Sequence, residues 1–180
     1  MPSRIAPAEP PYEPWAQAAF DRVMPPGAEP LLLFRVLARD RRLFERFMGG
    51  GLLDRGHLSL RDRELVIDRV TARNGSEYEW GVHIAFFADR IGLTEAQRKA
   101  IVDGAADAGC WPPREALLLR LVDTIDATTR VEEALWQAAV TEFGELACLE
   151  IILLCGFYRT VSLLTNTLEL PGEPGAARFP

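Results

Sequence analysis

The chain has 180 residues and a net charge of −6 at neutral pH, with 48% hydrophobic and 26% charged residues. This length and composition are typical of a single globular domain that buries its own core. The acidic balance argues against a nucleic-acid partner bound through a basic surface, and three cysteines are too few for a disulfide framework.

The N-terminal half of the sequence predicts a proline-rich arm followed by helices. Residues 1–30 carry eight of the 13 prolines and are predicted to form an extended arm with one short helix over Trp15–Val23. An amphipathic stretch, Leu31–Met48, ends at three glycines. The next signals are a Ser59 N-cap for a helix to about Asn74, a stop at Gly75, and a Ser76 start for a helix to Ile91.

The C-terminal half is also predicted to be helical. Its helix starts are signalled by a Thr94–Gln97 capping box, the pair Pro112–Pro113, a Thr129–Glu132 capping box, and Gly144 before Glu145–Leu168. No strand-like alternation and no internal repeat is present in the sequence. We therefore predict an all-α fold of about seven or eight helices over residues 31–170, followed by a flexible tail over 171–180.

The cysteine count and the apolar segments bear on the cellular compartment of the protein. An odd number of cysteines is typical of a reducing environment. The most apolar segment, Ile151–Tyr158, is much shorter than the roughly 20 residues that cross a bilayer. Prolines interrupt the N-terminus, which has no signal-peptide pattern. We expect a cytoplasmic protein with no membrane partner.

The centre of the chain carries the candidate chemistry. Ser76, Glu79 and His83 stand three and four residues apart, so one helix face presents all three. Trp80 lies one turn before His83 and adds an aromatic neighbour. Burial would lower the pKa of this imidazole and the nearby carboxylate would raise it.

The preceding helix places a second carboxylate near this face. Glu64 lies in the same inward stripe as Leu60 and Ile67, so it is either paired or held with a raised pKa. Glu64 is 10 residues before the Asn74–Gly75 turn and His83 is eight after it. An antiparallel helical hairpin would therefore bring Glu64, Glu79 and His83 into one pocket.

Structural interpretations of the same residues stay open. Ser76 and Glu79 also form a capping box, which needs no chemistry. His83 is interpretable as a core histidine, and Glu64 as an ion-pair partner of Arg61 or Arg69. Two histidines without a cluster at ligand spacing argue against a metal site. No glycine-rich strand-to-helix turn indicates a nucleotide cofactor, so no cofactor is expected.

Three stretches, Arg61–Val66, Asn74–His83 and Ile91–Thr94, resemble the carboxymuconolactone decarboxylase family, which shares its fold with alkylhydroperoxidase D. The similarity covers most of residues 31–170 and includes the spacing of Glu64, Tyr78, Trp80 and His83. It implies an alkylhydroperoxidase D-like helical bundle whose subunits associate as trimers or hexamers. Active sites then lie near the subunit contacts.

The peroxidase branch of this family has a Glu-x11-Cys-x2-Cys-x3-His pattern. Here the glutamate corresponds to Glu64 and the histidine to His83, but Ser76 and Glu79 replace the two cysteines. Neither replacement forms a disulfide, which excludes thiol peroxidase chemistry at these positions.

The decarboxylase branch is the better match, and it implies cofactor-free acid/base chemistry on a small unsaturated lactone or keto acid, by decarboxylation or isomerisation. The resemblance assigns the acid/base role to His83 and an orienting role to Glu64. Glu79 would tune His83, while Tyr78 and Trp80 would line the pocket. An arginine, which the sequence does not identify, would hold a substrate carboxylate. Because Glu79 adds negative charge, a less charged substrate is also expected.

Two other functions remain as alternatives. The first is a non-catalytic homo-oligomer that binds a small ligand or another protein. The second, and the weaker, is peroxide reduction by the remaining cysteines, Cys110, Cys148 and Cys155.

Overall fold

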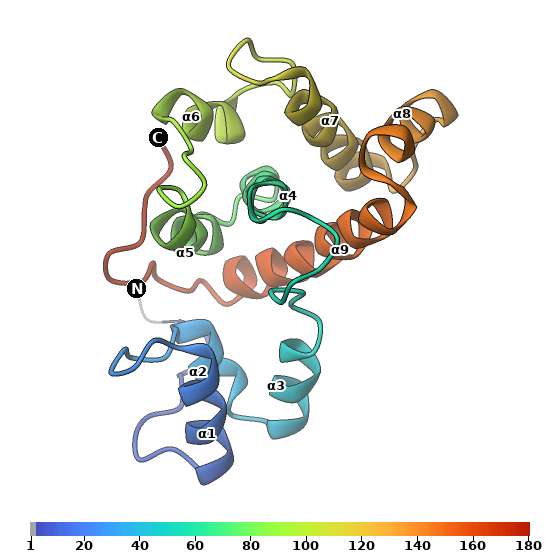
Figure 1. Cartoon of the computed structure of the whole chain (residues 1–180). Coiled ribbons are helices and arrows are strands. Elements are labelled where there is room, and N and C mark those ends of the chain that lie inside the picture. The colour runs from blue at the N-terminus through green and yellow to red at the C-terminus, as the bar shows by residue number, and fades with distance from the viewer. Residues whose placement is uncertain (1–2) are drawn as a thin grey trace.

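A computed structural model describes residues 3–180 of the chain, and these residues form nine helices and no strand (Figure 1). In chain order the helices are α1 (Pro14–Val23), α2 (Leu32–Leu37), α3 (Arg41–Met48), α4 (Leu60–Arg73), α5 (Glu77–Phe87), α6 (Glu95–Asp103), α7 (Pro113–Thr128), α8 (Glu133–Phe143) and α9 (Glu145–Thr167). The all-α prediction is confirmed.

Helix α4 lies at the centre of the molecule, and α5, α6, α7 and α9 pack around it (Figure 1). Every residue from Asp62 to Thr71 is buried. A helix enclosed on all sides has no solvent-facing stripe, so its charged residues must find partners inside the protein. This enclosure places the charged side chains of α4 in the core, where the candidate site lies.

The hairpin of α4 and α5 forms for the reasons that the sequence suggested. Ser59 caps α4 by accepting a hydrogen bond from the Asp62 N–H. Asn74 ends the helix, and Gly75 takes a φ of 66°, a left-handed conformation that glycine adopts without strain. Ser76 then caps α5. The short turn makes the two helices neighbours.

Three predictions about the helices need correction. Leu31–Met48 is two helices, α2 and α3, because Asp40 leaves the helical conformation and caps α3 through the Leu43 N–H at 2.9 Å. This break raises the count to nine. The Thr129–Glu132 capping box is wrong, since Thr129 ends α7 with a φ of 57° and α8 starts without a side-chain cap. Helix α5 also ends at Phe87, before the predicted Ile91.

The N-terminal arm contains the predicted short helix, α1, and builds a small core of its own. Phe20 of α1 packs edge-on against Phe44 of α3, with ring centroids 5.8 Å apart. The alanines Ala16, Ala19 and Ala38 complete this cluster. The N-terminal helices therefore gather at one end of the molecule (Figure 1) and form part of the wall of the cavity described below.

The C-terminal tail runs along α5 (Figure 1). The Ala177 N–H donates to the Gly81 carbonyl at 3.1 Å, and Phe179 packs against Trp80 with ring centroids 5.2 Å apart. Glu173 accepts hydrogen bonds from the Tyr78 hydroxyl and from the Leu32 N–H. The tail thus has a defined path in the structure, while its flexibility in solution stays a prediction.

Substituting Gly81 with alanine is expected to release this tail. A Cβ at Gly81 would lie well inside contact distance of the Ala177 carbonyl oxygen, which is backbone and cannot rotate away. We expect faster proteolysis C-terminal to Leu170 in Gly81→Ala, measured by mass spectrometry. Gly109→Ala is the control, because the space around Gly109 is open. Equal cleavage in both variants would contradict the described packing.

Helix α9 is long and apolar enough to cross a bilayer by length and composition, the one such helix within residues 3–180. Half of its apolar window is buried inside the molecule, where it packs against α4, α7 and α8. A central helix of a globular core commonly has this composition. The cytoplasmic location stays a prediction.

Candidate active site

The hairpin brings Glu64 and His83 into direct contact. Glu64 Oε2 lies 2.7 Å from His83 Nδ1, and the glutamate side chain is fully enclosed. The expectation that these positions come level in an antiparallel hairpin is therefore confirmed. This hydrogen bond fixes the imidazole ring and directs Nε2 away from α4.

Arg63 holds the second oxygen of the same carboxylate. Its Nε and Nη2 lie 3.0 and 2.8 Å from Glu64 Oε1, and its Nη1 donates to the Leu53 carbonyl at 2.8 Å. The sequence pointed to Arg61 or Arg69 as the partner, but these two arginines pair with Glu115 and Asp123. Arg63 therefore positions Glu64 and also ties down the loop that follows α3.

Glu79 lies on the other side of the imidazole. Its Oε1 is 3.4 Å from His83 Nε2, and the side chain is 11% exposed. Only half of the predicted capping box forms. Ser76 Oγ accepts from the Glu79 N–H at 3.4 Å, whereas the Glu79 carboxylate turns to the histidine. Ser76 itself is buried and shares a 2.8 Å hydrogen bond with Thr165, which gives it a structural role.

The charges of this cluster balance when His83 is protonated. Burial lowers the pKa of His83, but the hydrogen bonds and charges of Glu64 and Glu79 outweigh it and raise the pKa from 6.5 to about 10. Two carboxylates then face the imidazolium and the Arg63 guanidinium. The group is neutral overall, and at neutral pH the imidazolium is a proton donor.

A cavity of about 510 Å³ opens beside this cluster. Helix α5 presents Glu79, Val82, His83 and Phe86 to it, in the one-face spacing of a helix. Phe87, the last residue of α5, also lines it. The other walls come from the N-terminal arm, from α2 and α3, from the loop after α3 and from α9: Val23, Met24, Pro25, Leu31, Phe34, Phe47, Met48, Gly49, Gly51, Leu52, Leu53, Asp54, Phe157 and Tyr158.

Tyr158 is a site residue that the sequence reasoning missed. It lines the cavity, and its ring meets His83 edge-on, with centroids 5.2 Å apart. Burial, together with the charges of Glu79 and Glu64, holds the pKa of the phenol well above 10. The hydroxyl therefore stays protonated and can donate a hydrogen bond. The signal in the sequence was a tyrosine in the middle of the most apolar helix.

Tyr78 and Trp80 do not line this cavity, so the expectation that they do is wrong for this site. The Tyr78 hydroxyl accepts from the Leu33 N–H at 3.0 Å and donates to Glu173. Trp80 is buried beneath Phe179 of the tail. Both residues lie on faces of α5 that pack against other parts of the chain.

Asp68 is a second buried carboxyl near the cluster. It lies one turn after Glu64 on α4, and its Oδ1 has no hydrogen-bond partner among the described residues. Burial raises the pKa of Asp68 well above 3.8, against the attraction of His83. Because an unpaired buried carboxylate is costly, burial favours the neutral form of this carboxyl.

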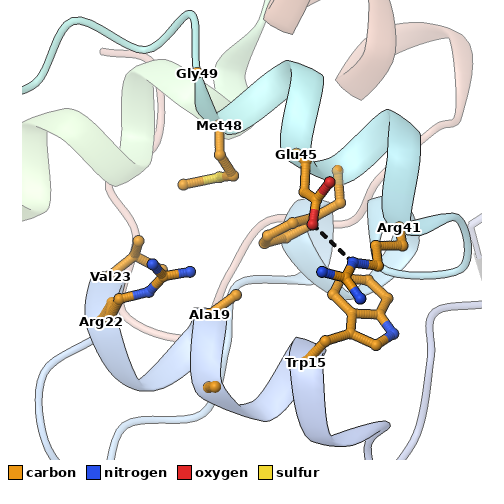
Figure 2. A pocket seen from close by; sticks show the side chains of 10 residues that line it. Trp15, Ala19, Arg22, Val23, Arg41, Glu45, Met48 and Gly49 are labelled. Carbon is orange, nitrogen blue, oxygen red and sulfur yellow. Dashed lines mark hydrogen bonds and ion pairs between the residues drawn. The ribbon is translucent and has the colours of Figure 1, made fainter.

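A larger and more open groove of about 770 Å³ lies between α1 and α3. Figure 2 shows Trp15, Arg22, Val23 and Met48 around it, and Arg41 paired with Glu45 at 2.7 Å. These residues include no acid/base pair of the kind formed by His83. Since size alone does not make a catalytic site, we place the candidate site in the cavity at His83.

The middle of this chain matches the model of a known protein family. Residues 41–123 match the carboxymuconolactone decarboxylase family, so the resemblance seen in the sequence is confirmed over this region. The matched region contains Glu64, Glu79 and His83. No curated protein matches the chain.

Two solved structures share the fold. One is an uncharacterized peroxidase-related protein from Silicibacter sp. TM1040, with a TM-score of 0.81 and 17% identity, covering 96% of this chain and 92% of its own. The other, from Ralstonia eutropha JMP134, is described as an alkylhydroperoxidase AhpD core and uncharacterized peroxidase-related protein. Its TM-score is 0.76 and its identity 20%, covering 95% and 92% of the two chains. The fold of this chain is therefore alkylhydroperoxidase D-like.

Proposed function

We propose that this protein catalyses proton transfer at carbon without a cofactor. It has an alkylhydroperoxidase D-like fold, and its residues 41–123 match the carboxymuconolactone decarboxylase family. The substrate is a small unsaturated carbonyl compound such as a lactone or keto acid, and the reaction is a decarboxylation or an isomerisation. The supporting observation is the row of three contacting side chains, Glu64, His83 and Glu79, which begins in the core and ends at a cavity.

The roles follow from position. Glu64 is fully enclosed and does not line the cavity, so it positions His83 and favours its charged form. The His83 imidazolium is the acid, and the Glu79 carboxylate beside it is the base. The two groups lie 3.4 Å apart on one helix face, so both can reach one bound molecule.

Both reactions use the same groups. In an isomerisation, Glu79 removes a proton from the carbon next to the carbonyl group, and the electron pair of the C–H bond moves into the conjugated carbonyl system. The proton returns at another carbon. In a decarboxylation, the carbon–carbon bond breaks instead, carbon dioxide leaves, and His83 protonates the carbanion. In each case the protein must stabilise an enolate oxygen.

A turnover assay tests this proposal. Purified protein, treated with a chelator, is incubated with a panel of unsaturated lactones, lactone acids and β-keto acids, and products are identified by NMR. We expect turnover that Glu79→Gln reduces strongly. Absence of turnover across the panel, or full turnover by Glu79→Gln, would contradict it.

A second candidate function, non-catalytic binding of a small ligand, is favoured by one observation. Both imidazole nitrogens of His83 already face carboxylates, so the cluster is also a self-contained structural ion pair. Under this function, a thermal-shift screen gives ligands that stabilise the protein and none of them is converted.

Peroxide reduction finds less support. Cys148 and Cys155 are buried in α9. Burial raises the pKa of both thiols, that of Cys155 to about 12, which disfavours the reactive thiolate. Cys110 does not line the cavity. Full peroxide consumption by a variant with all three cysteines replaced by serine would exclude this activity of the thiols.

We also propose that the chain forms a homo-oligomer through α9. The outer face of this helix exposes Leu146, Leu149, Leu153 and Leu163, each by more than half. An apolar stripe of this length is typical of a subunit contact.

Charging this stripe is expected to dissociate the oligomer. Leu149→Glu with Leu153→Glu places carboxylates where a second copy would pack, so sedimentation should give the mass of one protomer for the variant and a multiple of it for the wild type. Asp103→Asn, on an exposed helix face, is the control. A monomeric wild type at micromolar concentration would contradict the proposal.

A further inference from the structure

We propose that the substrate is an uncharged, largely apolar carbonyl compound, held with its carbonyl oxygen at the Tyr158 hydroxyl. This inference rests on the proposed acid/base function and narrows it to isomerisation, because a molecule without a carboxylate has no carbon dioxide to lose. It also assigns to Tyr158 the stabilisation of the enolate oxygen.

The cavity offers no cation for a substrate carboxylate. Among the described residues that line it, none is arginine or lysine. Two guanidinium groups lie over the Phe87 ring without lining the cavity, that of the exposed Arg90 at 5.2 Å and that of Arg63 at 5.7 Å. Arg63 makes three hydrogen bonds to Glu64 and Leu53. Its donors are thus already committed to holding the site together.

The ionisable groups that do line the cavity disfavour an anion. They are Asp54, Glu79, His83 and Tyr158. The positive charge of His83 is matched by Glu64 and Glu79 on its two nitrogens, which leaves no net positive charge for a ligand. A carboxylate entering here would lose its hydration and gain no partner of opposite charge.

The walls fit an aromatic or alicyclic skeleton. Five phenylalanines, together with Met24 and Met48, surround the space: Phe34, Phe47, Phe86, Phe87 and Phe157. Aromatic rings and thioethers pack well against flat apolar rings. A volume of about 510 Å³ is in the range that encloses an organic molecule of one to three rings.

Tyr158 supplies the polar contact that such a molecule needs. Its hydroxyl makes no hydrogen bond to another described residue, although the ring is almost fully enclosed and lines the cavity. A free donor beside His83 is well placed to bind the carbonyl oxygen and, as charge develops, the enolate oxygen. Glu79 then removes the proton from the adjacent carbon, and His83 delivers a proton at the conjugated position. The proton on Glu79 passes back to His83, 3.4 Å away, so no external reactant is required.

Binding of a matched pair of probes tests the substrate class. Coumarin-3-carboxylate and its methyl ester share one unsaturated lactone skeleton and differ in the charge of one group. By calorimetry at pH 7.5 we expect the ester to bind at least about tenfold more tightly than the acid, a difference of roughly 1.4 kcal/mol. Equal or tighter binding of the acid, or no binding of either at millimolar concentration, would overturn the proposal.

A second measurement, with the variant Arg22→Ala, would detect binding of an anionic substrate. Arg22 lines the neighbouring groove (Figure 2), which shares Val23, Met48 and Gly49 with the cavity. If the acid binds more tightly and Arg22→Ala removes this preference, a carboxylate reaches the groove and the proposed class is wrong. Under the proposal, Arg22→Ala leaves binding of the ester unchanged.

Tyr158→Phe tests the hydrogen bond itself. Isotope-edited infrared spectra of the ester labelled with ¹³C at the lactone carbonyl should show a lower stretching frequency on the wild type than on Tyr158→Phe, while the melting temperatures agree within a few degrees. The same frequency on both proteins would overturn the assignment. Binding of the ester, without turnover of any uncharged unsaturated lactone in the panel that has a C–H bond next to its carbonyl group, would retain the substrate class and reject the catalytic function. Turnover of acids alone would do the reverse.

Discussion

Replacing His83 with glutamine is expected to slow proton transfer on a bound substrate by about 10²–10⁴-fold, the usual contribution of a positioned acid or base. The glutamine amide nitrogen can still donate to one of the two carboxylates, but the side chain cannot carry the proton. The rate measured is that of deuterium incorporation from D₂O into the substrate, followed by NMR. The same variant should bind the substrate with similar affinity, because the apolar walls of the cavity are unchanged.

The pH dependence of the wild-type rate should reflect the titration of His83. His83 must be protonated to act as the acid, and its pKa is raised to about 10 by Glu64 and Glu79 against the effect of burial. The rate should therefore fall as the pH rises through about 10. His57→Gln is the control for both measurements, since His57, the only other histidine, is exposed and outside the cavity. A comparable loss of rate in both variants would contradict the assignment.

Replacing Glu64 with alanine is expected to destabilise the fold by about 3–5 kcal/mol, the usual cost of breaking a buried ion pair from one side. The carboxylate accepts from Arg63 on one oxygen and faces His83 on the other. Its removal leaves the Arg63 guanidinium and the His83 ring buried without their partner. The free energy of unfolding is measured by urea titration at neutral pH.

Asp103→Asn is the matched control for this prediction. Asp103 pairs with Lys99 one turn away, but both side chains are more than half exposed. Surface pairs of this kind contribute about 0.3–0.5 kcal/mol, so the control should unfold near the wild-type midpoint. Similar effects of the two substitutions would show that the Glu64 cluster is not the buried network described above.

The hairpin and its two central residues were predictable because the signals are local. Capping serines and the Asn74–Gly75 turn set where α4 and α5 start and stop, and the register of an antiparallel pair then follows from counting residues. The break between α2 and α3 was not predictable from periodicity, because the apolar spacing continues across it. The two helices are separated by a turn that ends at Asp40, whose side chain accepts from the Leu43 N–H and caps α3.

The walls of the cavity were less predictable than its acid/base pair. Helix α5 is buried on nearly every side, so periodicity does not tell which aromatic residues face the ligand space and which meet the tail. This explains why Tyr78 and Trp80 were assigned to the pocket and why Tyr158 was missed. Tyr158 is distant in sequence and reaches His83 only through the packing of α9 against α5.

Arg63 illustrates a second limit of the sequence. A residue next to Glu64 in a helix ordinarily points in a different direction, so Arg61 and Arg69 were the natural partners for it. In the structure the guanidinium of Arg63 turns to the Glu64 carboxylate and also donates to the Leu53 carbonyl. Such a contact depends on long-range burial rather than on spacing.

The central claim is that Glu64 and Glu79 hold His83 protonated at the edge of the cavity, and titration of this side chain tests it directly. The protein is labelled with ¹⁵N at histidine, and the ring nitrogen shifts of His83, assigned by comparison with His83→Gln, are followed from pH 5 to 11. We predict a pKa near 10 in the wild type and a lower pKa in Glu79→Gln, where one carboxylate is gone. A wild-type pKa at or below the ordinary value of about 6.5 would contradict the claim.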